Sequence, residues 1–192
     1  MAFHLSKGQS VNLDKDITFA FFGFNWEDGR YDGNNDFDID ASAFLLWKNG
    51  KVRNNADFVF FNNLEHNSGS VRHQGDSMGC MDCDDDQIFI DFSKVPAEIE
   101  KIVFTATIYE ASARKQNFGQ VTCAYARFVR LSTIVDEGTE VLRFDLGEEF
   151  STETGIVVCE IYRSENEWVF KAVGTGYHGD LKAFCECFGV NM

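Results

Sequence analysis

Proline, long apolar runs and basic residues are all scarce in this sequence, and each scarcity excludes a class of protein. Pro96 is the single proline and no Gly/Ser-rich linker is present, so we expect one domain over residues 1–192. No stretch approaches the roughly 18 apolar residues of a spanning helix, which argues against direct membrane insertion. The 17 Lys and Arg against 31 Asp and Glu leave a charge of −14, so nucleic-acid phosphates would be repelled.

A secretion leader, a disulfide framework and the common catalytic motifs are missing as well. Residues 1–6 show no basic region before an apolar stretch, so we expect a cytoplasmic protein with its six cysteines reduced. We expect Cys123 and Cys159 to be core residues within strands. HExxH, G-x-S-x-G, Walker A and GxGxxG patterns do not occur, and we therefore expect no enzyme.

What the sequence has in abundance is alternation of apolar and polar residues, together with 20 Phe. In residues 141–146, for example, Leu142, Phe144 and Leu146 share one face of an extended strand. Many short strands without alternating helices predict an all-β, antiparallel, two-sheet β-sandwich. The expected strands are 17–24, 41–47, 57–61, 88–92, 102–109, 123–131, 141–146, 156–162 and 168–173, with turns at 48–50 and 164–167.

One or two short peripheral helices complete the expected fold. Residues 93–100 carry Pro96 in the first turn, where proline is tolerated. The C-terminal segment has the stronger pattern, with apolar residues at i, i+3, i+4 and i+7 from Leu181. Asp180 is the expected N-cap and Gly189 the expected stop.

The negative charge is concentrated in two stretches, residues 27–40 and 76–86, which hold eleven acidic residues and one base, Arg30. Two such charges 4 Å apart repel by about 4 kcal/mol at an effective dielectric constant of 20. Solvated loops that keep the protein soluble are one explanation. A bound divalent cation is the other, because it reverses the sign of this repulsion.

The spacing within the first stretch favours the cation. Asp36, Asp38 and Asp40 alternate with Phe37 and Ile39, so an extended chain places the carboxylates on one side, about 6.5–7 Å apart. The apolar pair would anchor the segment to the core.

The ligand chemistry points to calcium. Carboxylates, backbone carbonyls and the nearby Asn62 and Asn63 suit Ca²⁺, which takes six to eight oxygens, better than Mg²⁺. Neither stretch has the Gly and Glu positions of an EF-hand, so loops of a β-protein would build the site.

Cys80 and Cys83 have the C-x2-C spacing of a zinc or redox site. A structural zinc site would need a second pair, and the close pair that remains is Cys185 and Cys187. Because Cys185 falls on the apolar stripe of the C-terminal helix, zinc is disfavoured. The alternative function is a thiol-based binder of soft metal ions or metalloid oxyanions through Cys80 and Cys83.

Several segments occur in an order typical of a known family. They are residues 5–8, 36–44, 58–64, 75–76, 84–86, 110–121, 144–146, 151–154 and 176–177. Over nearly its whole length the chain thus resembles the TerD family of tellurite-resistance and general stress proteins. The second acidic stretch departs from the family pattern at Cys83 and Gln87, where carboxylates are expected, and at Asp82 and Asp84, where glycines are expected.

The resemblance implies a two-sheet β-sandwich with about two Ca²⁺ ions bound by acidic loops at one end. It also implies a non-enzymatic stress-response role, with sister stress proteins and a membrane-embedded complex as partners. The candidate metal ligands are Asp32, Asp36, Asp38, Asp40, Asn62, Asn63, Asp76, Asp82, Asp84, Asp85 and Asp86.

Overall fold

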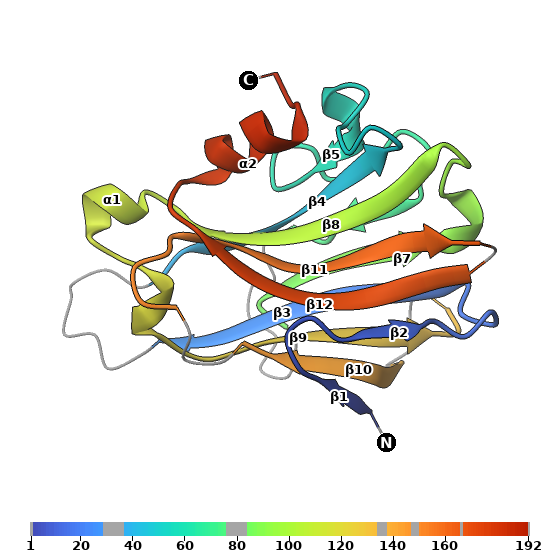
Figure 1. The fold of residues 1–192 in the computed structure, drawn as a ribbon, viewed down its shortest axis with the longest axis horizontal. Helices are drawn as coiled ribbons and strands as arrows, with labels where there is room; N and C mark the ends of the chain where they lie inside the picture. The colour runs from blue at the N-terminus through green and yellow to red at the C-terminus, as the bar shows by residue number, and fades with distance from the viewer. Residues whose placement is uncertain are drawn as a thin grey trace.

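The computed structural model describes residues 2–28, 37–75, 84–133, 138–146, 150–165 and 167–191. These residues form two six-stranded sheets that lie face to face, which confirms the predicted all-β sandwich (Figure 1). The first sheet has the order β1 (Phe3–Leu5), β10 (Thr139–Asp145), β9 (Val121–Leu131), β3 (Phe19–Asp28), β7 (Asp86–Asp91) and β6 (Val71–His73). The second has the order β2 (Ser10–Asn12), β12 (Glu167–Tyr177), β11 (Gly155–Ser164), β8 (Ile99–Ile108), β4 (Ile39–Trp47) and β5 (Phe58–Val59).

The pairing of strands is antiparallel with one exception among the described residues. β1 runs parallel to β10, with Phe3 opposite Leu142. The neighbouring short strand β2 belongs to the other sheet, where it pairs with β12. The N-terminal segment therefore crosses from the edge of one sheet to the edge of the other.

Aromatic side chains fill the space between the sheets. Phe22 of β3 stacks on Phe104 of β8 with ring centroids 4.6 Å apart, and Phe128 of β9 meets Phe170 of β12 at 5.8 Å. All four rings are almost completely buried. Truncating a buried Phe to Ala costs about 3–5 kcal/mol, so these cross-sheet pairs are a main source of stability.

The C-terminal helix is confirmed as predicted. α2 (Leu181–Phe188) begins after Asp180, whose side chain accepts a hydrogen bond from the Ala183 N–H at 3.3 Å. It ends at Gly189 in the left-handed conformation. Phe184 is buried with Phe44 and Phe58 in a small apolar cluster, so the helix packs on the outer face of the second sheet.

The predicted helix over residues 93–100 is wrong. A single 3-10 turn, η2 (Phe92–Lys94), occupies its start, and β8 already begins at Ile99. The Asp91 side chain accepts from the Ser93 N–H and closes this turn locally. The apolar residues that follow are buried as part of a strand, so the segment is too short for an α-helix.

Residues 57–61 form less strand than expected. The 3-10 helix η1 (Asn55–Asp57) comes first, and β5 contains only Phe58 and Val59. Phe60 and Asn63 then close a turn through mutual backbone hydrogen bonds. This turn exposes Phe61, which the sequence pattern had placed in a strand.

Two further expectations have opposite outcomes. The turn at residues 164–167 is confirmed, because Ser164 of β11 lies opposite Glu167 of β12. Cys159 is buried as expected, whereas Cys123 is exposed and has a φ of 53°. The placement of Cys123 in the core was wrong because β9 changes register against β3 at this point.

The remaining described elements are short. They are α1 (Ala111–Arg114) and the 3-10 helix η3 (Phe118–Gln120), both between β8 and β9. No helix in the described part of the chain has the length and apolarity needed to cross a membrane.

Candidate metal centre

The start of β4 places its side chains as the alternation predicts. Phe37 and Ile39 are buried, Asp38 is exposed and Asp40 is partly exposed. The carbonyl of Asp38 accepts a 2.8 Å hydrogen bond from the Tyr109 N–H, which fixes this segment to the end of β8. The apolar pair thus anchors the first acidic stretch, and the Asp38 carboxylate faces outward.

The described ends of the two acidic stretches lie near each other because Asp86 joins the two sheets. Its Oδ2 accepts a 2.6 Å hydrogen bond from the backbone N–H of Ala41 on β4. β5 pairs with β4 only at Ala43 and Phe44, so the outward N–H of Ala41 would otherwise be an unpaired edge group. Asp86 begins β7 in the first sheet, so this contact spans the sandwich.

His73 is the second residue of the first sheet that hydrogen-bonds the edge of β4 at Ala41. The Gly75 N–H donates to His73 Nδ1 at 2.9 Å, so the ring hydrogen lies on Nε2. Nε2 donates to the Ala41 carbonyl at 3.1 Å and lies 3.6 Å from Asp86 Oδ1. One imidazole and one carboxylate from the first sheet therefore satisfy both outward backbone groups of Ala41.

Asp84 is buried, with 1 % of its surface exposed, and is held by an ion pair. Its Oδ1 lies 2.7 Å from Arg127 Nε and also accepts from the Asn25 amide, and Gln87 Nε2 donates to Oδ2 at 3.2 Å. Partial burial tends to lower the pKa of Arg127, but the hydrogen bond and charge of Asp84 outweigh this and raise it. Asp84 thus has a structural role that the sequence did not reveal.

The backbone beneath Asp84 requires glycine. A Cβ on Gly23 of β3 would collide with the Asp84 carboxylate. The neighbouring Asp85 is exposed, and its Oδ2 accepts from the Trp26 N–H at 3.0 Å. β3 changes register between Asn25 and Glu27, which leaves the Trp26 N–H to be satisfied by a side chain.

Asn62 and Asn63 lie in the turn after β5. Asn63 Nδ2 donates to the Phe58 carbonyl, so its amide stabilises the turn, and Asn62 is exposed. Phe61 and Leu64 of the same segment line a hollow of about 530 Å³ together with Asp38 and Asp40. The asparagine turn therefore borders the first acidic stretch, as a shared site requires.

The described residues contain only part of the predicted ligand set. Among them, no group of three or more His, Cys, Asp and Glu side chains is arranged to hold a metal ion. Asp32, Asp36, Asp76 and Asp82 lie outside the described residues, as do Cys80 and Cys83. The candidates that are described offer oxygen ligands, which fit a hard cation such as Ca²⁺.

The residues that sequence reasoning missed are His73, Arg127 and Gly23. His73 follows Val71 at the spacing of two that buries both in β6, which is the one local signal for it. Arg127 and Gly23 act across strands, and no local pattern marks them.

Comparison with known proteins is decisive for the family. The family model described as TerD domain matches residues 1–188. The chain belongs to the TerD family. It is similar to tellurium resistance protein TerD of Serratia marcescens, with 47% identity over 100% of this chain and 99% of the relative. The Bacillus subtilis (strain 168) protein YceE is 52% identical and its general stress protein 16U is 43% identical, each over 100% of both chains.

Two solved structures share the fold of this chain. SAV2460 superposes with a TM-score of 0.68 at 20% identity, covering 93% of this chain and 100% of that one. SCO6318 of Streptomyces coelicolor A3(2), described as a TerD homologue, has a TM-score of 0.65 at 14% identity and covers 88% and 95%. At these identities the likeness shows the shared fold of the TerD-family sandwich.

Proposed function

We propose that this TerD-family chain is a cytoplasmic, non-enzymatic stress-response protein that binds about two Ca²⁺ ions through its acidic loops. The observation that carries the proposal is the hydrogen bond from the Ala41 N–H to Asp86. It holds the strand that carries Asp38 and Asp40 against the start of β7, which Asp85 immediately precedes. Carboxylates from two sheets are thereby collected at one end of the molecule.

The charge balance supports a cation here. The protein carries a net charge of −14, and two of its bases at this end are already paired, Arg127 with Asp84 and Arg114 with Asp38. Ca²⁺ would supply positive charge to the carboxylates and would order the loops that carry them. The residues expected to hold it are Asp32, Asp36, Asp38, Asp40, Asn62, Asn63, Asp76, Asp82, Asp84, Asp85 and Asp86.

The proposal assigns Asp84 and Asp86 a double task. Both already accept hydrogen bonds from the protein, but an ionised carboxylate has about four lone-pair sites.

The ordered loops would present a surface to other proteins, with sister stress proteins and a membrane-embedded complex as the expected partners. Names of relatives such as tellurium resistance protein and general stress protein support the stress-response role.

Calorimetric titration with Ca²⁺, with Mg²⁺ and Zn²⁺ as controls, tests whether the protein binds calcium. A ligand at 100 times its dissociation constant stabilises a fold by about 2.7 kcal/mol. For a chain of this size that corresponds to a rise in melting temperature of roughly 5–10 °C. The double variant Asp38→Asn, Asp40→Asn should lose most of the rise, and Glu98→Gln, an exposed control, should keep it. An unchanged melting temperature at millimolar Ca²⁺ would refute calcium binding.

A further inference from the structure

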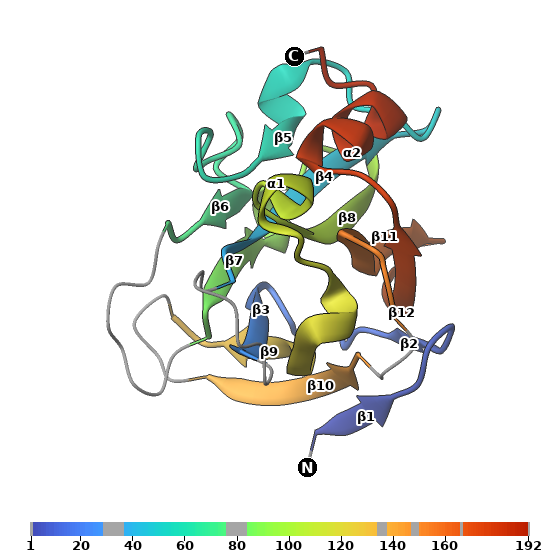
Figure 2. The ribbon, with the colours of Figure 1, turned by 90° about the vertical axis from the view of Figure 1, so that its left-hand side faces the viewer.

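A groove runs from the first acidic stretch to the start of α2. It consists of two adjoining hollows of about 530 and 640 Å³, which share Asp40, Phe61 and Tyr109 among their lining residues. The larger hollow continues along the turn into α1 to Leu181. Figure 2 faces this end of the molecule, where α1 and the start of α2 both line the larger hollow. We call this feature the acidic groove.

The acidic groove gathers exposed apolar side chains. Among the described residues, five large apolar side chains are exposed, namely Phe3, Phe61, Leu64, Tyr109 and Tyr177. Three of them, Phe61 at 39 %, Leu64 at 45 % and Tyr109 at 47 %, line the groove. Exposed apolar groups that cluster in one concavity mark a binding surface more often than isolated ones do.

The charge of the lining is predominantly negative. The lining includes four acidic residues, Asp38, Asp40, Glu110 and Asp180, and the basic residue Lys182 of α2. Asp180 also caps α2, where its side chain accepts a hydrogen bond from the Ala183 N–H. A partner that fills the apolar part of this groove must therefore also bring positive charge.

Arg114 shows how such a partner would bind. Its guanidinium lies 5.2 Å from the centre of the Tyr109 ring, and Nη2 is 3.7 Å from Asp38 Oδ2. The rim of the groove thus already holds one cation between an aromatic ring and a carboxylate. Cation–π and carboxylate contacts together are the chemistry that recognises Arg and Lys side chains.

We propose that the acidic groove docks a protein segment in which aromatic or aliphatic side chains are flanked by Lys and Arg. The apolar residues of the segment pack on Phe61, Leu64 and Tyr109, and its cations face Glu110 and the neighbouring aspartates. This inference deepens the partner-facing role proposed above and rests on that role, but it does not require bound Ca²⁺. A second copy of the chain fits the groove poorly, because two molecules of charge −14 repel each other.

Fluorescence anisotropy tests the docking with the full-length chain and a labelled peptide in which Trp and Leu are flanked by Lys and Arg. Two control peptides are matched to it: one has Ser in place of Trp and Leu, and the other has Glu in place of Lys and Arg. The measurement is made in chelator, so that it does not depend on calcium binding. We expect each control peptide to bind at least about fivefold more weakly, the loss typical of removing an interface anchor.

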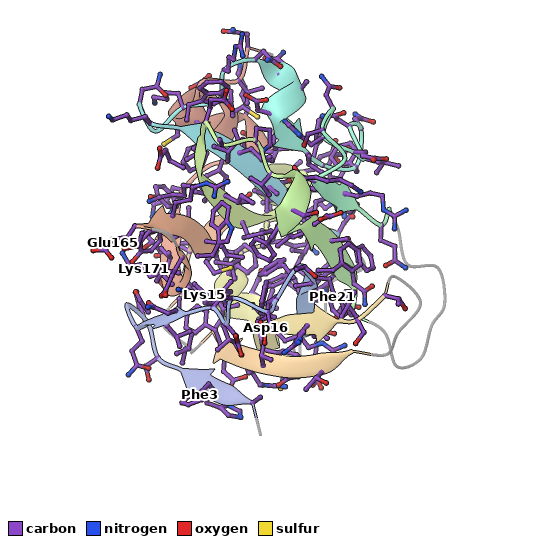
Figure 3. All side chains as sticks on the ribbon, turned by 90° about the vertical axis from the view of Figure 1, so that its right-hand side faces the viewer. Phe3, Lys15, Asp16, Phe21, Glu165 and Lys171 are labelled. Atoms are coloured by element: carbon purple, nitrogen blue, oxygen red, sulfur yellow. The ribbon has the colours of Figure 1, made fainter. Side chains whose placement is uncertain are left out.

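Paired variants locate the site. Phe61→Ala and Glu110→Lys should each weaken binding by about fivefold or more. Phe3→Ala and Glu98→Lys should leave it unchanged, since Phe3 lies on β1 at the edge of the other sheet (Figure 3). Tyr109→Ser provides a second test of the apolar contact if Phe61→Ala fails to fold, as judged by circular dichroism.

Three results would overturn the inference. The first is equal binding of the peptide that lacks Trp and Leu, which would show attraction by charge alone. The second is the same affinity for the groove variants and their controls. The third is a dimer in solution that Phe61→Ala dissociates, which would make a second copy the occupant. Calcium titration without peptide remains separate, so its failure would be distinguished from failure of the docking.

Discussion

Asp86 and the backbone of Ala41 form a 2.6 Å hydrogen bond between the two sheets, within a region that excludes solvent. The bond joins two residues that lie 45 positions apart in the sequence, beside the described ends of the two acidic stretches. It also makes the stability of the fold depend on a carboxylate that belongs to the predicted metal site.

Replacing Asp86 by Ala should destabilise the protein even without metal. The change leaves the buried N–H of Ala41 without its acceptor, and an unsatisfied buried donor costs about 1–3 kcal/mol. We expect the melting temperature in chelator to fall by about 2–4 °C for each kcal/mol lost. Glu98→Ala is the control, because Glu98 is exposed and its removal should change the temperature little. Equal melting temperatures for the two variants would contradict the structural role of Asp86.

Gly23→Ala should disturb the ion pair between Asp84 and Arg127. The added Cβ would meet the Asp84 carboxylate, which Arg127 holds in place. Overpacking of this kind costs about 1–3 kcal/mol. Urea unfolding should therefore shift to lower midpoint with unchanged slope. A midpoint like that of the unmodified chain would show that Asp84 moves aside freely.

Removing Arg114 should strengthen calcium binding. Its guanidinium lies 3.7 Å from Asp38 and competes with any cation for that carboxylate. Exposed ion pairs contribute about 0–1 kcal/mol, so the affinity of Arg114→Gln for Ca²⁺ should rise by up to about fivefold. Lys115→Gln removes the same charge from the next residue and is the control. A similar rise in both variants would indicate a general charge effect instead of competition at Asp38.

Acid should remove the contribution of Glu153 to stability. Hydrogen bonds from the backbone N–H groups of Thr152 and Ser151 lower the pKa of this carboxyl below its ordinary value of 4.5. A group with a lowered pKa in the folded state stabilises the protein above its ordinary pKa, and this is lost as pH falls through the folded value. The difference in melting temperature between the unmodified chain and Glu153→Gln should therefore shrink below pH 4.5.

The same pair of proteins supplies the check on this pH dependence. If the Glu153→Gln difference stays constant down to strongly acidic pH, the two backbone hydrogen bonds do not stabilise the charged carboxyl.

Local patterns predicted those parts of the molecule that local physics determines. The alternation of Phe37 and Ile39 with aspartates placed the former in the core and Asp38 outside, as the structure shows. The spacing from Leu181 to Phe188, with Asp180 and Gly189 at its ends, defined α2. In each case neighbouring residues alone carry the signal.

Contacts across the sandwich could not be predicted in this way. The bond between Asp86 and Ala41 and the ion pair of Asp84 with Arg127 join strands that are distant in sequence. The helix expected over residues 93–100 failed for a related reason, because Ile99 pairs with Trp47 of β4 and is drawn into the sheet. Tertiary pairing outweighed the weak helical preference of a short segment.

The edge strands β1 and β2 affect the order in which the two sheets are completed during folding. β1 pairs with β10 and β2 pairs with β12, so both strands meet partners that lie more than a hundred positions later in the chain. Neither edge can close before β10 and β12 have been synthesised. Pairing over such sequence separations is slow, so the closing of these two edges is a late step of folding.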